Sequence, residues 1–147
     1  RKMLPEVDLV KVNETEAALL TGMDQLTPGN LDRLEASTRR LLEQGPAAAV
    51  LTLGPRGSYF QTGRAGGYVP PYQVETVDSV GCGDAFVAGL LTQLGSTQKN
   101  LADLEEEDFF RALGFANAVG ALTSLRRGVI PALPTLAEVE TFLSKQK

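Results

Sequence analysis

The chain has 147 residues, of which 43% are hydrophobic and 22% charged, and its formal net charge is −4. These values are typical of one globular domain with its own core. They argue against a general nucleic-acid or membrane surface, and no stretch is long and apolar enough to span a bilayer. The absence of histidine excludes Ser–His–Asp and Cys–His catalysis. The single cysteine, Cys82, excludes an internal disulfide or a cysteine zinc cluster and suits a cytoplasmic protein.

The first elements in chain order are an expected strand over residues 7–12 and a helix that follows it at once. The chain enters this strand without a signal-peptide pattern, as the interior of a longer gene product would. Asn13 is a good N-cap, Glu16 lies three residues later as in a capping box, and Gly22 is a typical helix stop. Capping alone explains the Asn13–Glu16 pair, so the pair does not by itself indicate a ligand site.

The middle of the chain predicts an amphipathic helix over 31–44 and a buried strand over 47–53. The segment Thr52-Leu53-Gly54-Pro55-Arg56-Gly57 then reads as a turn between two paired strands, with glycines at the bend. Arg56 is either an exposed turn residue or a neutraliser of phosphate charge. Residues 66–72 and 74–77 are expected to form short edge strands, because prolines limit their pairing.

The most informative stretch is Asp78-Ser79-Val80-Gly81-Cys82-Gly83-Asp84, which precedes an apolar helical run up to residue 94. Amides of Gly81, Cys82 and Gly83 at the start of that helix would form an anion site. Asp84 is then either an ordinary helix cap or a base that accepts a proton from a hydroxyl attacking a phosphate. Cys82 is either a small packing residue or a thiol activated by the helix start.

The C-terminal third predicts two helices, over 109–125 and 135–145. The acidic run over 105–108 suits the helix dipole and is expected to face water. Small residues in the helix over 109–125 favour close packing, and Asn117 is its notable polar residue on an apolar face. The segment over 129–134 is expected to be extended.

The stretch Asp-Ser-Val-Gly-Cys-Gly-Asp-Ala-Phe-x-Ala-Gly resembles the second signature of the ribokinase-like (PfkB) carbohydrate kinases, usually written D-T-x-G-A-G-D. The N-x-x-E element at Asn13–Glu16, the Thr-Leu-Gly-x-x-Gly element and the closing segment from Asn117 resemble further elements of that family, in the same order. The resemblance implies a ribokinase-like three-layer α/β/α sheet, of which the chain would form the C-terminal portion.

The resemblance also implies roles for particular residues. Asp84 would be the catalytic base, and Gly81, Cys82 and Gly83 would hold the transferring phosphate. The nucleotide site would take Asn13, Glu16, Thr52, Gly54, Gly57, Gly83 and Asn117, with Glu16 holding Mg²⁺ through water and Asn117 beside the adenine. A monovalent cation such as K⁺ would lie between two loops, on Asp78, Val80, Thr123, Arg126, Gly128 and Ala132.

The function implied by the resemblance is an ATP-dependent transfer of the γ-phosphate of MgATP to a sugar hydroxyl. The run Asp8-Leu9-Val10-Lys11-Val12-Asn13 and the cysteine at position 82 favour a fructokinase. Ribokinase and 2-keto-3-deoxygluconate kinase remain alternatives, as does a pseudokinase that only binds ATP. The N-terminal sugar-binding and lid half of the family is expected to be absent from residues 1–147, so this fragment alone would be weak or inactive. A homodimer is an option for the full-length protein.

Overall fold

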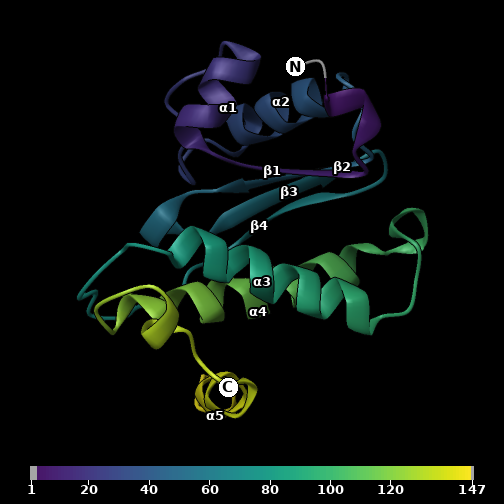
Figure 1. Cartoon of the computed structure of the whole chain (residues 1–147). Helices are drawn as coiled ribbons and strands as arrows, with labels where there is room; N and C mark the ends of the chain where they lie inside the picture. Colours follow the sequence, from purple (N-terminus) through teal and green to yellow (C-terminus); the bar gives the residue numbers. More distant parts are fainter. Residues whose placement is uncertain (1–2, 147) are drawn as a thin grey trace.

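The fold is a four-stranded sheet between two layers of helices, seen edge-on in Figure 1. A computed structural model describes residues 3–146. The strands lie in the order β1-β2-β3-β4, with bounds Leu9–Asn13, Ala48–Thr52, Ser58–Thr62 and Gly66–Val69. The helices are α1 (Glu14–Thr21), α2 (Leu31–Leu42), α3 (Cys82–Ser96), α4 (Glu106–Ser124) and α5 (Leu136–Ser144). Short 3₁₀ segments cover Leu4–Glu6, Gly54–Arg56, Leu101–Asp103 and Ile130–Ala132. The expected three-layer α/β/α architecture is therefore confirmed.

The sheet combines one parallel and two antiparallel pairings. β1 and β2 run parallel, joined through α1 and α2, as a crossover connection requires. β2 and β3 form the expected antiparallel pair around the 54–57 turn, and β4 adds antiparallel to β3. This topology puts the carboxyl ends of β1 and β2 at the same edge of the sheet, where α1 and the 54–57 turn begin.

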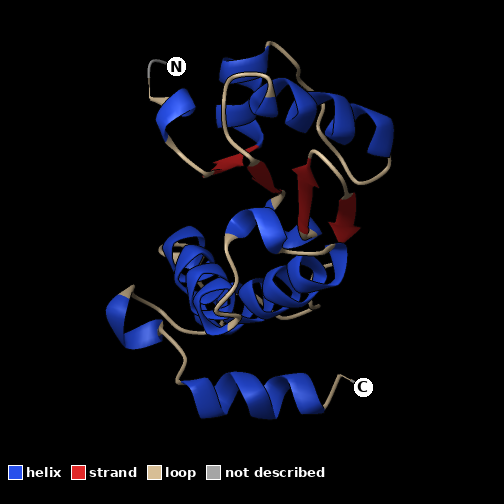
Figure 2. Ribbon diagram, turned by 90° about the vertical axis from the view of Figure 1, so that its right-hand side faces the viewer, coloured by secondary structure: helices blue, strands red, loops and turns tan. Residues whose placement is uncertain are grey.

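Each face of the sheet carries its own hydrophobic core. Because side chains alternate along a strand, Val50 and Phe60 face α3 and α4, whereas Leu51 faces α1 and α2. On the α3–α4 side, Phe60 stacks on Phe109 with ring centroids 5.0 Å apart. A third, smaller core holds α5 beneath α4, where Figure 2 shows α5 as the element furthest from the strands.

Helices α3 and α4 pack closely because small residues line their contact. A Cβ atom on Gly89 would lie 2.9 Å from Val119 Cγ2 and 3.2 Å from the Cα atom of Ala116. Gly89 therefore lets the two backbones approach, as the small residues of the sequence predicted. This packing fixes the position of the α3 N-terminus relative to the sheet.

Capping interactions define the starts of four helices. Capping boxes close α1, α4 and α5, and the side chains of Asn30 and Thr135 accept from backbone amides at α2 and α5. The expectation that residues 105–108 all face water is wrong for Asp108, which is buried. Its carboxylate accepts from the Glu105 amide at 3.1 Å and from Lys99 Nζ at 2.7 Å, so its burial is compensated.

Three further sequence-based expectations need correction. Residues 74–77 form no strand; their chain is tied to α4 instead, where the Val77 amide donates to Ser124 O at 2.8 Å. The segment 129–134 is not extended but contains the 3₁₀ turn Ile130–Ala132. β1 begins at Leu9, not at residue 7. Across residues 3–146, no helix is long and apolar enough to cross a membrane.

We predict that Phe60→Ala lowers the free energy of unfolding by about 3–5 kcal/mol, because it leaves a cavity under Phe109 in a well-packed core. Phe60 is fully buried and also contacts Phe110 edge-on, with centroids 5.2 Å apart. Urea unfolding followed by circular dichroism measures the change. Met3→Ala is the control, since Met3 is 76% exposed and its loss should change the free energy little. An equal loss in both variants would contradict this description of the core.

Candidate active site

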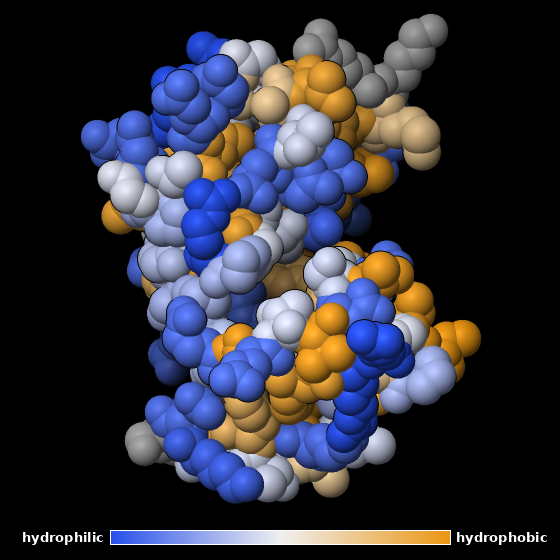
Figure 3. All heavy atoms as spheres, turned by 90° about the vertical axis from the view of Figure 1, so that its left-hand side faces the viewer, coloured by the Kyte–Doolittle hydropathy of each residue, from blue (hydrophilic) through white to orange (hydrophobic). Residues whose placement is uncertain are grey.

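A cavity of about 680 Å³ lies where the carboxyl ends of β1 and β2 meet the N-terminus of α3. Figure 3 faces this end of the molecule and shows its surface hollowed between the two halves. The cavity brings together seven of the residues predicted for the site: Asn13, Thr52, Gly54, Gly57, Cys82, Gly83 and Asn117. Glu16, Asp78, Val80, Gly81, Asp84, Thr123, Arg126, Gly128 and Ala132 do not line it.

The N-terminus of α3 opens into this cavity without a side-chain cap. Its N-cap is Gly81, with φ of 81°, and within residues 3–146 the amides of Gly83 and Asp84 have no intramolecular partner. The Cys82 amide already donates to Ser79 O at 3.3 Å. The free amides and the positive end of the helix dipole make this the point of the cavity best suited to an anion.

The glycines of this region serve different purposes. A Cβ atom on Gly81 would lie 2.8 Å from Val129 Cγ1, and one on Gly57 would lie 2.3 Å from Val69 O. Both residues also have positive φ values, so backbone packing and conformation require glycine there. A Cβ atom on Gly83 would approach only Lys11 Nζ, at 3.8 Å. Gly83 therefore leaves open space at the helix end.

Asp84 lies in the first turn of α3, next to Gly83, and its side chain is exposed. The structure gives it no hydrogen bond or ion pair with any residue among 3–146. Its carboxylate is therefore free to accept a proton from a molecule bound beside the helix end.

Asn13 and Glu16 make the reciprocal capping box of α1. Asn13 Oδ1 accepts from the Glu16 amide at 2.9 Å, and Glu16 Oε2 accepts from the Asn13 amide at 2.8 Å. Capping accounts for both side chains, and only Asn13 also lines the cavity. Among residues 3–146, no group of three or more Asp, Glu, Cys or His side chains is placed to hold a metal ion.

The 54–57 turn forms another wall of the cavity. Gly54 has φ of 57° and no atom within 4 Å of a Cβ position, so it leaves room on the cavity side. Arg56 forms an ion pair with Glu14 at the start of α1, which supports the interpretation of Arg56 as a structural turn residue. Tyr68 Oη donates to Arg56 O at 2.8 Å and fixes the turn from β4.

Asn117 reaches the cavity from α4. Its Nδ2 atom donates to Pro70 O at 3.1 Å and to Val69 O at 3.3 Å. This amide therefore ties α4 to the chain leaving β4, while Gly120 and Ala121 on the same helix leave space beside it.

Comparison with known proteins decides the family. The model of the pfkB family carbohydrate kinases matches residues 1–136. The chain belongs to the pfkB carbohydrate kinase family.

Individual relatives agree with this assignment. Fructokinase-1 of Zea mays is 37% identical over 140 residues, which cover 95% of this chain and 41% of that protein. The crystal structure of a fructokinase with bound ATP from Xylella fastidiosa superposes with a TM-score of 0.81 at 29% identity, over 99% of this chain and 45% of that one. A fructokinase from Vibrio cholerae, crystallised with fructose, ADP and calcium ion, gives 0.73 at 33% identity, over 92% and 41%. The chain thus spans less than half the length of these relatives.

Next to the pfkB signature, two loops meet behind the start of α3. Asp78 Oδ1 accepts from the Val80 amide at 3.1 Å, and Asp78 Oδ2 accepts from the Gly128 amide at 3.2 Å. These bonds, with a smaller contribution from the charge of Arg127, lower the pKa of Asp78. The loop over 126–132 therefore braces the turn that precedes α3.

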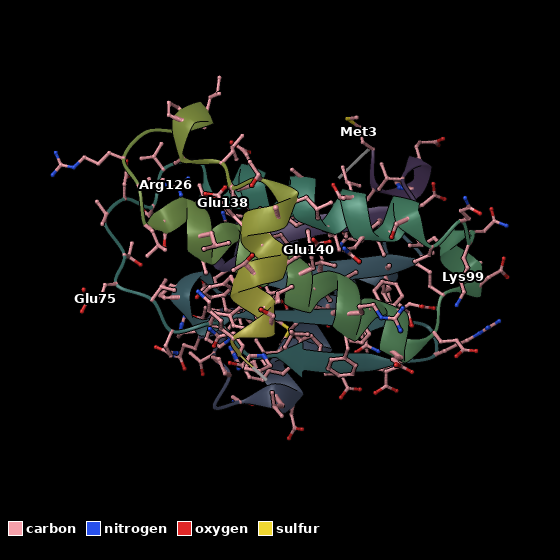
Figure 4. The ribbon with its side chains drawn as sticks, turned by 90° about the horizontal axis from the view of Figure 1, so that it is seen from below. Met3, Glu75, Lys99, Arg126, Glu138 and Glu140 are labelled. Carbon is pink, nitrogen blue, oxygen red and sulfur yellow. The ribbon has the colours of Figure 1, made fainter. Side chains whose placement is uncertain are left out.

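The remaining residues predicted for a cation site lie around the same loop. Thr123 and Ala132 are buried, and Thr123 Oγ1 donates to Val119 O at 2.8 Å. Arg126 turns outward to Glu138 at 2.7 Å, and Figure 4 shows the two side by side at the start of α5. The structure thus brings the predicted residues into one region, behind the start of α3 and outside the cavity.

The thiol of Cys82 is not activated by its position in the signature. Burial raises its pKa, and the nearby charge of Asp78 raises it further. A nucleophilic thiol needs a lowered pKa, so this direction argues against an activated thiol. Cys82 acts as a small packing residue whose sulfur lies 3.8 Å from Asp78 O.

One residue of the cavity was missed by sequence reasoning. Lys11 on β1 lines it and is the only lysine or arginine among the described residues that do so. The sequence signal that could have identified Lys11 is a basic side chain within an apolar strand, two residues before Asn13.

We predict that Gly81→Ala lowers the free energy of unfolding by about 1–3 kcal/mol, because alanine is strained at positive φ and its Cβ atom meets Val129. In a Val129→Ala background the clash is relieved, so the same substitution should cost less. Urea unfolding of the four proteins in this double-mutant cycle measures the difference. Gly95→Ala, in the same helix with open space around it, should not destabilise the protein. Equal costs in the two backgrounds would contradict the contact with Val129.

We also predict an acid-dependent contribution from Glu138. Hydrogen bonds from Arg126, from the Thr135 amide and from the Thr135 hydroxyl lower the pKa of Glu138 from 4.5 to about 2. Because the folded pKa is lowered, the carboxylate stabilises the protein above pH 4.5, and this stabilisation is lost as the pH falls toward 2. Glu138→Gln should make the free energy of unfolding fall less steeply across that range. Glu140→Gln on the same helix is the matched control and should keep the wild-type slope.

Proposed function

We propose that this chain is the nucleotide-binding part of an ATP-dependent carbohydrate kinase, most simply a fructokinase, whose sugar-binding and lid half lies outside residues 1–147. The observation that carries the proposal is the cavity at the carboxyl edge of the sheet, into which the uncapped N-terminus of α3 opens beside Asp84. Such an edge is where α/β sheets bind ligands. The relatives from Xylella fastidiosa and Vibrio cholerae were crystallised with ATP and with ADP, respectively.

The residues that line the cavity fit a nucleoside triphosphate. The free amides of Gly83 and Asp84 suit the oxygens of the phosphate that is transferred. Gly54, Gly57 and Thr52 line the cavity and would border the remaining phosphates and the ribose, whereas Asn117, Gly120 and Ala121, which also line it, would border a base. Only one acidic side chain, Glu14, lines the cavity among the described residues, and Arg56 neutralises it.

The proposed chemistry is an in-line phosphoryl transfer. The Asp84 carboxylate accepts the proton of a sugar hydroxyl, whose oxygen then forms a bond to the γ-phosphorus while the bond to the leaving ADP oxygen breaks. Asp84 is exposed and unpaired beside the helix end, as this role requires. The amides at the start of α3 stabilise the charge that develops on the transferred group.

Two ions complete the proposal. Asn13 and Glu16 would hold the hydration shell of Mg²⁺, which neutralises phosphate charge. Outer-sphere contacts through water need no cluster of carboxylates, and none is present among residues 3–146. For K⁺, the 78–80 and 123–132 segments offer the carbonyl groups of Val80, Thr123, Arg126, Gly128 and Ala132 next to the Asp78 carboxylate.

The relatives support a proposal for the substrate, and the lone cysteine supports one for the location. Fructose is favoured because the maize relative is a fructokinase and the Vibrio cholerae relative binds fructose. Ribose and 2-keto-3-deoxygluconate are the alternatives, since the sugar contacts lie outside this chain. A cytoplasmic location suits the lone, unpaired Cys82, and a homodimer is proposed for the full-length protein.

The test is Asp84→Asn in the complete gene product. We predict that fructose phosphorylation falls by at least about 100-fold, because the general base is lost. Calorimetric titration with a non-hydrolysable MgATP analogue, with and without K⁺, should show nearly unchanged affinity. Asp32→Asn, an exposed acid on α2 far from the cavity, is the matched control and should keep full activity.

Two results would overturn the proposal. Turnover that survives Asp84→Asn would remove the base assignment. Failure of the folded wild-type protein to bind the MgATP analogue would remove the nucleotide site. Nucleotide binding without phosphorylation of fructose, ribose or 2-keto-3-deoxygluconate would favour a pseudokinase.

A further inference from the structure

We infer that Lys11 binds the phosphate that this site transfers, together with the amides at the start of α3. The inference rests on the proposed nucleotide site and adds to it a residue that neither the signature nor the other motifs identified. Lys11 lies at the third position of β1, and its side chain lines the cavity.

The strand itself does not explain a lysine at this position. Leu9, two residues earlier and on the same face of β1, packs against the core formed with α3 and α4. The partner of Lys11 in register is Val50, which is fully buried in that core. An aliphatic side chain would therefore satisfy the fold here. A lysine on this face extends along the apolar surface and delivers its charge at the open end of the sheet.

The ammonium group of Lys11 lies close to another positive feature. Its Nζ atom is 3.8 Å from the position that a Cβ atom on Gly83 would take, in the first turn of α3. The positive end of the α3 dipole and the Lys11 charge repel each other at this distance. An anion placed between them would interact favourably with both.

No carboxylate within the described residues compensates for this charge. None of the salt bridges formed within residues 3–146 involves Lys11, and Glu14, the acid that lines the cavity, is paired with Arg56. Asp84, the residue after Gly83, makes no ion pair with Lys11 either. The charge is left for a ligand, and the free amides of Gly83 and Asp84 define where the ligand's oxygens lie.

The ligand class that fits is a phosphate group with two or more free oxygens. Tetrahedral oxygens can accept from the α3 amides and from a lysine ammonium at the same time. A flexible ammonium also suits a phosphoryl group that moves from donor to acceptor, because it keeps its charge contact without a fixed geometry. Lys11 would thus neutralise the negative charge of the phosphate, which the Asp84 carboxylate alone would repel.

The experiment compares Lys11→Met with the wild type in the complete gene product. Methionine keeps most of the length and apolar contact of lysine but removes its charge. Calorimetry measures affinity for a non-hydrolysable MgATP analogue and, separately, for adenosine, which lacks phosphates. We expect the analogue to bind about 10- to 100-fold more weakly while adenosine affinity stays unchanged. Lys11→Arg should retain most of the affinity, and Lys145→Met, at the exposed end of α5, should change neither.

Each result is decisive. A selective loss for the analogue, restored by arginine, supports the inference. An unchanged affinity for the analogue in Lys11→Met, or equal losses for both ligands, overturns it while leaving the nucleotide site in place. Wild-type protein that binds neither ligand overturns the proposed function together with the inference. Thermal unfolding of each variant shows whether any loss comes from unfolding instead.

Discussion

The close contact between α3 and α4 is the constraint on which the site depends. Gly89 lets α3 lie against Val119 and Ala116, and this packing leaves the N-terminus of α3 at the carboxyl edge of β1 and β2. The start of α3 also lies close to α4, since a Cβ atom on Gly120 would be 3.5 Å from Cys82 O. The position of an anion site is thus set by helix packing some two turns away from it.

The electrostatics of the site contrast with those of the chain as a whole. The protein carries a net charge of −4, yet the cavity combines a helix N-terminus, an unpaired lysine and a neutralised Glu14. The acids nearest to it are engaged elsewhere: Asp78 accepts from two backbone amides, and Glu16 caps α1. Asp84 is the exception, so the proposed phosphate site requires a positive group beside this carboxylate.

Much of the fold follows from local sequence signals. Capping residues located α1 and α5, amphipathic spacing located α2, and the glycine turn after β2 located the β2–β3 pair, because these signals act within a few residues. The irregular conformation of residues 74–77 was not predicted, since the amides of Val77 and Asp78 donate to Ser124 O, a contact across about fifty residues that no local pattern shows. The burial of Asp108 depends on Lys99 in the same way. Lys11 was missed because the feature that it faces, the start of α3, lies about seventy residues later in the sequence.

The signature itself mixes two kinds of requirement that only the structure separates. Gly81 must be glycine because of its positive φ and because a Cβ atom there would meet the Val129 side chain, so its presence indicates the fold and not a ligand. Gly83 has open space toward the cavity, and a side chain there would occupy the proposed place of the anion. Cys82, between them, packs with its thiol against Asp78 O, which explains why a small residue suffices at this position. Of the three residues, Gly83 is the one whose identity argues for phosphate chemistry.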